Sequence, residues 1–473
     1  MGFWTKIFPG INDYPKNSPG RNIALGLQHA FAMFCATILV PTLTGLDVGV
    51  ALFAAGVGTL IFHLCTGGRM PTFLGSSFAF IAALQTVIDK TGNPNDFGAT
   101  KTEQISAAMG GIIVAGLFYV LLAVLIKLFG NKFMHKLFPP VVRGVGIAII
   151  GLNLAGSAIG NIQTQYGADG IALELFGEGY DMKAFIFSWV IAGIVCLSAI
   201  ILSSYGKGMA KLSSIVIALA GGYIITLILV QTGLAPSSLM NTGALANHEW
   251  LEVPNFVFPS FNIKAIGIIA PIAIVTCVEH VGDVYANGAV VGKDFVTKPG
   301  LHRTMLGDGL ATVVAGCLGG PANTTYSENT AVLAATGNYN PAPLRIAALV
   351  AIVISFFGKA IGVIETVPAC VLGGACIVLY GMISSVGLRT LVENHVDFTK
   401  NRNLCIAAVM LVLSMGGAVI GNATFSFSGI GLGIISGILL NLILPEKKPV
   451  SDEAGLIAHT VDKSKLIQED EEN

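Results

Sequence analysis

Two glutamates within apolar sequence are the side chains of this chain that most directly suggest chemistry. Glu279 lies in the run IGIIAPIAIVTCVEHVGDVYA, and Glu328 lies in NTTYSENTAVLAATG. A carboxylate at the depth of a lipid bilayer costs about 2.5–3.5 kcal/mol on insertion scales, so it is rarely retained without a use. Two of them, each beside small polar residues, predict a binding site for a polar solute.

Titratable side chains near Glu279 predict that the same region handles protons. Asp283 follows Glu279 by four positions, which places both carboxylates on one face of a helix. His280 points about 100° away from that face, so we expect it to pack against or orient its neighbours. His29 lies in the apolar run LQHAFAMFCATILVP, where a lone histidine is more often a hydrogen-bonded core group. These four residues are the candidates for proton coupling.

The residues around Glu328 favour a flat, polar ligand. Tyr326 and Ser327 precede this glutamate, and Asn329 follows it. A carboxylate accepts two hydrogen bonds side by side, and an amide both donates and accepts. This set suits a planar solute with alternating N–H and C=O groups, such as a nucleobase. Asn329 is equally compatible with a cap at the start of the following helix.

Two short polar segments, 72–88 and 323–337, are expected to position these groups. Each begins with hydroxyl-rich, extended-looking sequence and continues with only two or three turns of helix-compatible sequence. Irregular backbone inside a membrane must be buried in protein or line a cavity, and matching interrupted segments mark binding sites in transporters. Ser77 belongs to the polar start of the first segment. The ring of Phe78 could stack on a flat ligand or serve as an ordinary core aromatic.

The composition excludes a large soluble enzyme. Hydrophobic residues make up 53% of the 473 residues, charged residues only 11%, and the mean hydropathy is +0.76. A soluble chain would carry about a quarter charged residues. We therefore predict an all-α polytopic membrane protein, and fourteen candidate spans can be placed at 22–45, 48–66, 72–88, 105–129, 138–160, 183–203, 211–232, 262–287, 302–319, 323–337, 342–363, 367–390, 403–421 and 428–446.

The distribution of Lys and Arg predicts how these spans are oriented. They gather in alternate connections, so the positive-inside rule places both termini in the cytoplasm of a multi-pass protein of the cell membrane. The first twenty residues lack the apolar region of a signal peptide. The polar end from Lys447 onward, which closes with QEDEEN, is expected to be a disordered cytoplasmic tail.

The spans divide into two halves of seven, separated by the connection 233–261. Because seven is odd, the halves would have opposite orientations, which is the inverted-repeat plan of many secondary transporters. The fifth span, FPPVVRGVGIAIIGLN, and the twelfth, VPACVLGGACIVLYGM, support this plan. At one common offset, Pro139 aligns with Pro368 and Gly144 with Gly373.

Several other classes of function lack their sequence signatures. No P-loop, H-E-x-x-H or G-x-S-x-G motif is present, so ATP-driven transport and the common hydrolases are disfavoured. The eight cysteines contain no C-x-x-C pair, and they indicate neither a disulfide framework nor a metal site. We expect no enzyme activity, no catalytic residues, no cofactor or metal, and no nucleic-acid partner.

Several motifs resemble the nucleobase–ascorbate transporter (nucleobase:cation symporter-2) family, and most of all its bacterial uracil permeases. They are LQHAFAMFCATILVP, GSSFAF, VEHVGD, PGLHRTMLGDGLATVVAGCLGGPANTTYSENTAV and LYGMISSVGLRTLVENHVDFTKNRNL, spread over about residues 20–445. The resemblance implies a 7+7 inverted repeat in which the third and tenth segments meet as two antiparallel strands at the midplane. It also implies a homodimer formed through the gate domain.

The resemblance further implies a division into domains. The expected parts are a cytoplasmic N-terminal segment, 1–21; a core domain, 22–129 and 262–363; a gate domain, 138–232 and 367–446; and the tail, 447–473.

Residue roles follow from the same resemblance. Glu279 would bind the pyrimidine N–H edge and Glu328 the opposing part of the ring, with backbone amides near Phe78 and Ser327 holding the ring carbonyls. Phe78 and Tyr326 would flank the ring. Purine-type members commonly carry glutamine at the position of Glu328, which favours a pyrimidine here. Three positions depart from the uracil permeases: Asp283 replaces a histidine, and Ser327 and Ala331 replace glycines.

The expected function is uracil import by proton symport, through alternating access between the core and gate domains. Sodium is an alternative coupling ion. A purine or xanthine symporter of the same family is the first alternative. An anion transporter or channel with the 7+7 fold is the second, and a membrane-embedded enzyme with paired carboxylates is the third.

Overall fold

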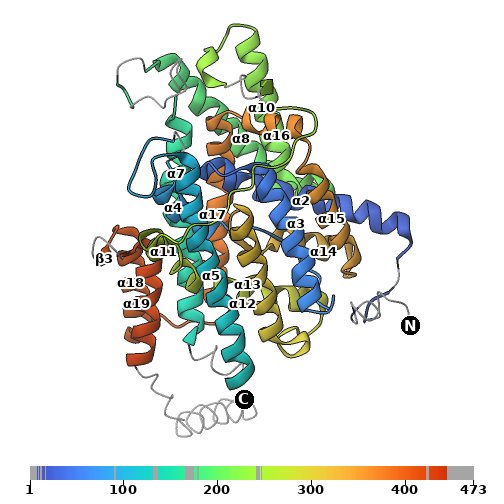
Figure 1. Ribbon diagram of the computed structural model, residues 1–473, viewed down its shortest axis with the longest axis vertical. Coiled ribbons are helices and arrows are strands. Elements are labelled where there is room, and N and C mark those ends of the chain that lie inside the picture. The colour runs from blue at the N-terminus through green and yellow to red at the C-terminus, as the bar shows by residue number, and fades with distance from the viewer. Residues whose placement is uncertain are drawn as a thin grey trace, which may run out of the picture.

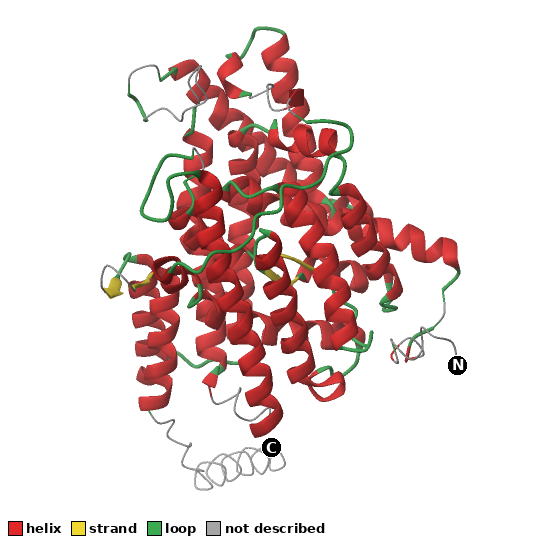
Figure 2. Ribbon diagram, viewed as in Figure 1, coloured by secondary structure: helices red, strands yellow, loops and turns green. Residues whose placement is uncertain are grey.

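The computed structural model describes residues 8, 10, 13–15, 17–89, 92–130, 137–165, 175–177, 180–240, 245–246, 248–421 and 426–444. Helices form most of this part of the chain, with one pair of short strands in the middle of the molecule and another at its edge (Figure 2). The expected tail 447–473 and most of the expected N-terminal segment 1–21 lie outside the described residues.

The first half of the chain runs from α2 to η3. Its elements are α2 (Pro19–Thr44), α3 (Val48–Cys65), β1 (Leu74–Ser76), η2 (Phe78–Phe80), α4 (Ile81–Val87), α5 (Lys101–Phe129), α7 (Pro140–Gln163), α8 (Met182–Tyr205), α9 (Met209–Leu212), α10 (Ser214–Gln231) and η3 (Ser237–Leu239).

The second half runs from α11 to α19. Its elements are α11 (Ile263–Ile269), α12 (Ile272–Val291), η5 (Val296–Gly300), α13 (Leu301–Leu318), β2 (Asn323–Thr325), α14 (Ser327–Thr336), α15 (Ala342–Ile354), α16 (Gly358–Glu365), α17 (Ala369–Glu393), α18 (Asn401–Met415), β3 (Val419–Gly421), β4 (Ser426–Ser428) and α19 (Gly429–Ile443).

Every predicted span overlaps a helix or a strand followed by a helix. Among the described residues, eight helical spans are long and apolar enough to cross a membrane, α11 and α12 together counting as one, and α15 with α16 forms a further bent pair. Many apolar side chains are exposed along these helices, Leu121, Ile201 and Ile224 among them. Such an apolar surface is unfavourable in water and compatible with the hydrocarbon of a bilayer, so the chain is a multi-pass membrane protein.

The two predicted extended segments meet as antiparallel strands. In β1 and β2, Leu74 pairs with Thr325 and Ser76 with Asn323. All six strand residues are buried. The ladder continues at both ends, because the Ser77 amide donates to the Ala322 carbonyl over 2.8 Å and the Tyr326 amide donates to the Phe73 carbonyl over 2.9 Å. Each strand leads directly into a short helix, so the irregular backbone is buried at the point where the two halves join.

Helices α7 and α17 pack against each other in opposite directions, as the proline and glycine alignment predicts. Each helix starts immediately after its proline, Pro139 or Pro368. Gly144, near the start of α7, lies against Leu391 near the end of α17, and Gly373, near the start of α17, lies against the end of α7. A side chain at either glycine would force the helices apart, so the matching positions have matching packing roles.

Three spans are less regular than their sequences suggest. The segment predicted at 342–363 is bent by 86° between α15 and α16. The segment at 262–287 is interrupted between α11 and α12 at Pro271, whose missing N–H removes a helical hydrogen bond. Strands β3 and β4 form an antiparallel pair between α18 and α19, where the sequence analysis expected helix as far as residue 421.

The helices pack in two groups. In one, α13 packs on α3 and α5, and α15 packs on α2 and α3; in the other, α17 packs on α7 and α8, and α18 packs on α19 and α7. Figure 1 shows α12 and α13 near the middle of the molecule, with α18 and α19 at the left edge and α15 on the right. Helix α12 also contacts α7 and α19, so its residues lie at the boundary between the groups.

Candidate functional site

Three of the predicted acidic residues come together at this boundary. Glu279 and Asp283 lie one turn apart on α12, and Glu328 lies in the first turn of α14. Glu279 and Asp283 are close enough to Glu328 for their charges to interact. All three are half-buried and Ser327 is exposed, so water-sized molecules reach this side of the two helices. The two glutamates predicted from the sequence are therefore neighbours in space.

Hydrogen bonds fix α12 relative to the crossed strands. The Thr325 hydroxyl at the end of β2 donates to Asp283 Oδ2 over 2.6 Å. One turn further along α12, the buried Asn287 amide donates to the Pro71 carbonyl at 2.8 Å and contacts the Thr330 hydroxyl at 3.2 Å. These bonds tie α12 to both short segments, so the carboxylates have a defined position relative to the half-helices.

Two backbone donors point out of the starts of the half-helices. Across the described chain, no hydrogen bond from the amide of Phe78 or of Ser327 to another residue is found. Initial amides of a helix lack partners within it and carry partial positive charge, so they attract oxygen acceptors. The Ser77 hydroxyl is buried and lacks a partner among the described residues. These groups can donate to ring carbonyls of a ligand.

Phe78 is the candidate aromatic that reaches the other helix group. Its ring is 9% exposed and lies edge-on to Tyr380 of α17, with ring centroids 6.3 Å apart. Tyr380 has no place among the sequence-predicted residues, because a tyrosine within an apolar run carries no distinguishing signal. The Phe78–Tyr380 pair therefore connects the half-helix to the second group of helices.

Tyr326 and Asn329 hold the scaffold together. The Tyr326 hydroxyl donates to the Ser76 carbonyl at 3.0 Å, and its ring covers Gly75 so closely that a Cβ there would collide with it. The Asn329 amide nitrogen lies 3.1 Å from both Nδ1 and the carbonyl oxygen of His29, and both side chains are buried. Contacts of this kind fix the half-helix against β1 and α2.

His280 points away from the other α12 acids. Its Nδ1 lies 2.9 Å from Asp308 Oδ2 on α13, and both side chains are fully buried. Phe62 and Tyr119 lie edge-on to the imidazole, with centroid distances of 6.4 and 6.5 Å. The sequence analysis assigned no role to Asp308, although a carboxylate inside an apolar helix is the same signal that singled out Glu279.

The carboxylates of Glu279, Asp283, Asp308 and Glu328 differ in whether another side chain already contacts them. Asp283 accepts a hydrogen bond from Thr325, and Asp308 is paired with His280. No hydrogen bond from another described residue to Glu279 or Glu328 is found. Among the described residues, no group of three or more His, Cys, Asp and Glu could hold a metal ion. Of the four acids, Glu279 and Glu328 are thus the two that remain available to a solute.

A bundle of membrane-spanning helices around two interrupted segments with acidic side chains is typical of secondary transporters. Solved structures share this fold. The murine Slc26a9 anion transporter gives a TM-score of 0.65 at 14% identity, with 93% of this chain and 71% of that chain covered. The transmembrane domain of the bicarbonate transporter BicA from a cyanobacterium gives 0.59 at 15% identity, with 89% and 96% covered. The predicted 7+7 fold is confirmed by these likenesses.

The chain belongs to the Permease family, whose sequence profile matches residues 20–422. A probable uracil permease of Pasteurella multocida is 41% identical over 90% of this chain and 94% of its own length. The uracil permease of Bacillus subtilis is 39% identical over 94% of this chain and 96% of its own. The predicted membership of the nucleobase–ascorbate transporter family is confirmed, and the chain is a transporter rather than an enzyme.

Proposed function

We propose that this protein imports uracil, or a closely related pyrimidine nucleobase, by proton symport. The observation that carries the proposal is that Glu279 and Glu328 accept no hydrogen bond from another described residue. They lie on elements in contact at two half-helix starts whose first amides also make no hydrogen bond within the described chain. A pyrimidine ring presents alternating N–H and C=O groups, which match carboxylate acceptors and amide donors. The uracil permeases among its relatives support the same solute.

In this proposal the ring lies between α12 and α14. Glu279 and Glu328 accept its N–H groups, while the Phe78 and Ser327 amides donate to its carbonyls. The Phe78 ring stacks on the flat face, and the Ser77 hydroxyl supplies one further donor. Tyr326 and the Asn329 amide nitrogen act indirectly, because they are engaged with Ser76 and His29.

Proton coupling would follow from the cost of moving charge. Helices α2–α5 and α11–α16 form the proposed core domain, and α7–α10 with α17–α19 form the proposed gate domain. A carboxylate carried past an apolar gate costs several kcal/mol, whereas a protonated carboxyl costs much less. A proton from outside on Glu279 or Asp283, together with bound solute, would permit the core domain to move. His280 and His29 would orient this network through Asp308 and Asn329. The distribution of Lys and Arg supports cytoplasmic termini in this proposal.

A purine or xanthine symporter is the second candidate. Asp283 favours it, because the uracil permeases that this chain resembles carry histidine at that position. Here its carboxylate is held by Thr325, which ties the residue to the scaffold. Competition of labelled uracil uptake by unlabelled xanthine, hypoxanthine and uracil separates the two candidates.

The shared fold does not favour an anion as the solute. Two proteins that share the fold are an anion transporter and a bicarbonate transporter. In this chain, the first turn of α14 carries Glu328, and no basic side chain occurs in the first turn of α12 or of α14. A negative side chain at a helix start opposes an anionic solute through charge repulsion.

Replacing Glu279 by Gln tests the proposed function directly. Purified protein in liposomes with an acidic exterior should accumulate labelled uracil, and the Glu279→Gln variant should lose at least roughly tenfold of the initial rate. Glu393→Gln is the matched control, because Glu393 is an exposed acid at the end of α17 paired with Arg389. Unchanged pH-driven accumulation by the Glu279→Gln variant would refute the proposal.

A further inference from the structure

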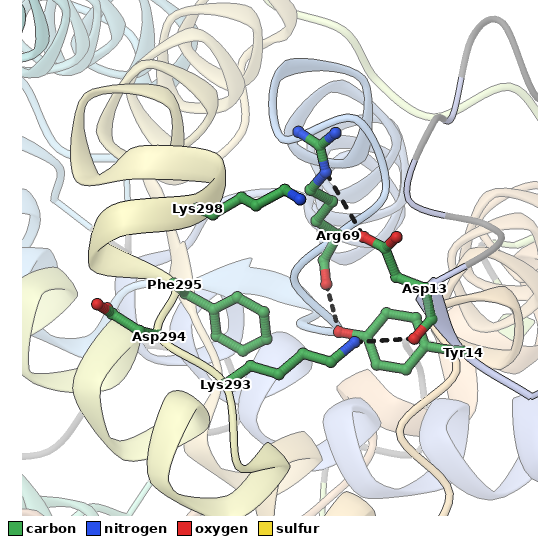
Figure 3. Close-up of a pocket in the computed structure, with 7 residues that line it drawn as sticks. All are labelled: Asp13, Tyr14, Arg69, Lys293, Asp294, Phe295 and Lys298. Atoms are coloured by element: carbon green, nitrogen blue, oxygen red, sulfur yellow. Dashed lines mark hydrogen bonds and ion pairs between the residues drawn. The ribbon is translucent and has the colours of Figure 1, made fainter.

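A positively charged cavity lies next to the N-terminal segment, apart from the candidate site described above. It has a volume of about 350 Å³ and is lined by Asp13, Tyr14, Arg69, Lys293, Asp294, Phe295 and Lys298. Figure 3 shows Arg69, Lys293 and Lys298 lining this space, with the Lys298 ammonium beside the Arg69 side chain and the Lys293 ammonium next to Tyr14. The three cations come from two connections: Arg69 lies between α3 and β1, whereas Lys293 and Lys298 lie between α12 and α13, Lys298 within η5. The volume is within the usual range of small-molecule sites.

The N-terminal segment closes one side of the cavity. The Tyr14 hydroxyl donates to the Arg69 carbonyl, and Lys293 Nζ donates to the Asp13 carbonyl over 2.9 Å. Lys293 Nζ also lies 3.6 Å from the centre of the Tyr14 ring. Further along, the Asn340 amide donates to the Pro15 carbonyl at 2.9 Å. These contacts fix the segment, so the cavity has a built wall.

The charges in the cavity are unevenly matched. Asp13 Oδ2 lies 3.6 Å from Arg69 Nε, which is a distant contact, and Arg69 Nε makes no hydrogen bond among the described residues. The Asp294 carboxylate is engaged by the amides of Val296 and Thr297 and by the Thr297 hydroxyl. Figure 3 shows it directed away from the cations. One carboxylate therefore faces three cations.

Of the three cations, Lys298 has the fewest partners for its charge. Its side chain is exposed, and no partner for its ammonium group is found among the described residues. Partial burial lowers the pKa of Lys293; the Asp13 carboxylate opposes this effect and the Lys298 ammonium adds to it. An anion placed between the ammonium groups would relieve their repulsion and supply the missing acceptors.

We propose that this cavity binds the phosphate group of a phosphate-bearing anion, held by Arg69, Lys293 and Lys298 above the buried Tyr14 and Phe295. Arg offers paired donors to a phosphate and Lys a compact charge, so the set suits this chemistry. The site is separate from Glu279 and Glu328, and the inference does not depend on which solute the protein carries. Two sources offer this group: a soluble nucleotide or the headgroup of an anionic lipid.

The test measures binding to the full chain in nanodiscs of phosphatidylcholine. Calorimetry with uridine monophosphate examines the soluble source, and uridine is the control without phosphate. Native mass spectrometry of protein from nanodiscs containing phosphatidylglycerol examines the lipid source. We expect one of the two probes to bind saturably, with roughly tenfold weaker binding in Lys298→Gln and in Arg69→Gln.

Two further variants sharpen the result. Lys127→Gln removes an exposed cation from the last turn of α5, outside the cavity, and should leave binding unchanged. Asp13→Asn removes the opposing carboxylate and should strengthen binding a few-fold. Because Lys298 has an exposed side chain, its variant should fold even if Arg69→Gln does not. Binding of neither probe, or binding equally sensitive to Lys127→Gln and Lys298→Gln, overturns the proposal.

Discussion

At the scale of residues, the polar groups near the middle of the chain divide by whether they are already engaged. The Thr325 hydroxyl donates a hydrogen bond to Asp283, and His280 is paired with Asp308. Within the described chain, Glu279 and Glu328 accept no hydrogen bond from another residue. An unengaged carboxylate costs free energy inside a membrane protein, and a bound solute with N–H groups offsets that cost.

Gly75 provides a residue-scale prediction about the scaffold. A Cβ at this position would collide with the Tyr326 ring, so Gly75→Ala should destabilise the protein by about 1–3 kcal/mol through overpacking. The melting temperature of the purified protein measures this, and labelled uracil uptake should fall with it. Gly381→Ala is the control, because a Cβ there meets nothing within 4 Å on α17 and should be neutral or stabilising. Equal melting temperatures for both variants would contradict the packing argument.

At the scale of elements, the sequence predicted the segments that break their own regularity. Hydroxyl-rich starts at Thr72 and Asn323 indicated extended backbone, because a short polar run inside an apolar segment cannot continue a spanning helix. The bend between α15 and α16 and the local β3–β4 pair escaped prediction, since each interrupts a segment that was predicted from its apolar composition. The 342–363 segment is apolar almost throughout and carries no local break signal comparable to Pro271.

The same limit applies to the candidate site. Glu279, Asp283 and Glu328 were found because a carboxylate in an apolar run is a local signal. That Asn329 would contact His29, about 300 positions away, is a property of the fold and not of either segment. Asp308 had the local signal, but its significance depends on its contact with His280.

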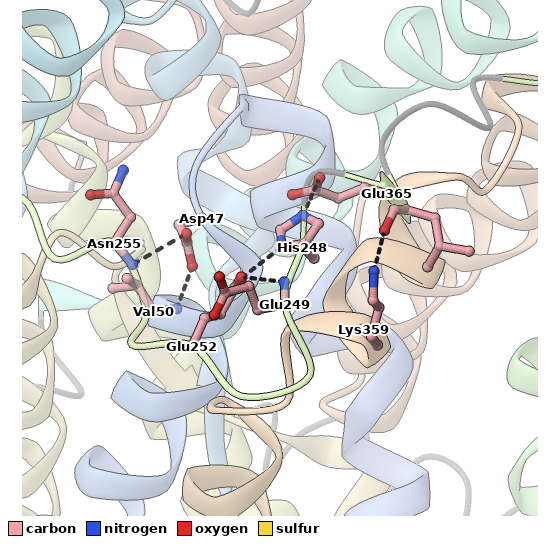
Figure 4. A network of polar contacts seen from close by, with 9 residues as sticks. Asp47, Val50, His248, Glu249, Glu252, Asn255, Lys359 and Glu365 are labelled. Atoms are coloured by element: carbon pink, nitrogen blue, oxygen red, sulfur yellow. Dashed lines mark hydrogen bonds and ion pairs between the residues drawn. The ribbon is translucent and has the colours of Figure 1, made fainter.

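The connection between α10 and α11 carries a pH-sensitive attachment. His248 Nδ1 lies 2.6 Å from Glu252, and Nε2 lies 3.1 Å from Glu365 at the end of α16. Figure 4 shows His248 between these carboxylates, with Glu249 and Lys359 nearby. Burial lowers the pKa of His248, but hydrogen bonds and charge attraction from the two carboxylates outweigh it, so the pKa is raised.

The sign of the pH effect follows from that raised pKa. The attachment should contribute fully below the ordinary histidine value of about 6.5 and be lost as pH rises through the higher folded value. Hydrogen–deuterium exchange around 248–256, corrected for intrinsic rates, should be slow at pH 6 and faster at pH 8. His248→Gln should remove this difference. The same pH response in the variant and the parent protein would exclude His248 as its origin.

At the scale of the whole molecule, the contact between Phe78 and Tyr380 joins the two helix groups. If the groups move relative to each other during transport, this contact must change. In a variant without native cysteines, a disulfide between Phe78→Cys and Tyr380→Cys should stop uracil uptake. Reduction should return uptake to the lower rate of the uncrosslinked double variant, which lacks the Phe78 ring. A crosslink between Ala148→Cys and Ser384→Cys is the control, because both residues lie within one group, where the Ser384 hydroxyl donates to the Ala148 carbonyl at 3.2 Å. Full uptake with the first crosslink in place would contradict movement at this boundary.

The pairing of β1 with β2 also has a consequence for biosynthesis. Leu74 and Thr325 are partners, so about 250 residues must be polymerised after the first strand before its mate exists. At about 5–20 residues per second, the wait lasts on the order of tens of seconds. During that interval, the backbone amides and carbonyls of β1 need other hydrogen-bond partners, because lipid provides none. The first repeat therefore cannot complete its fold when it is synthesised, and β1 can pair only after the second repeat has been translated as far as β2.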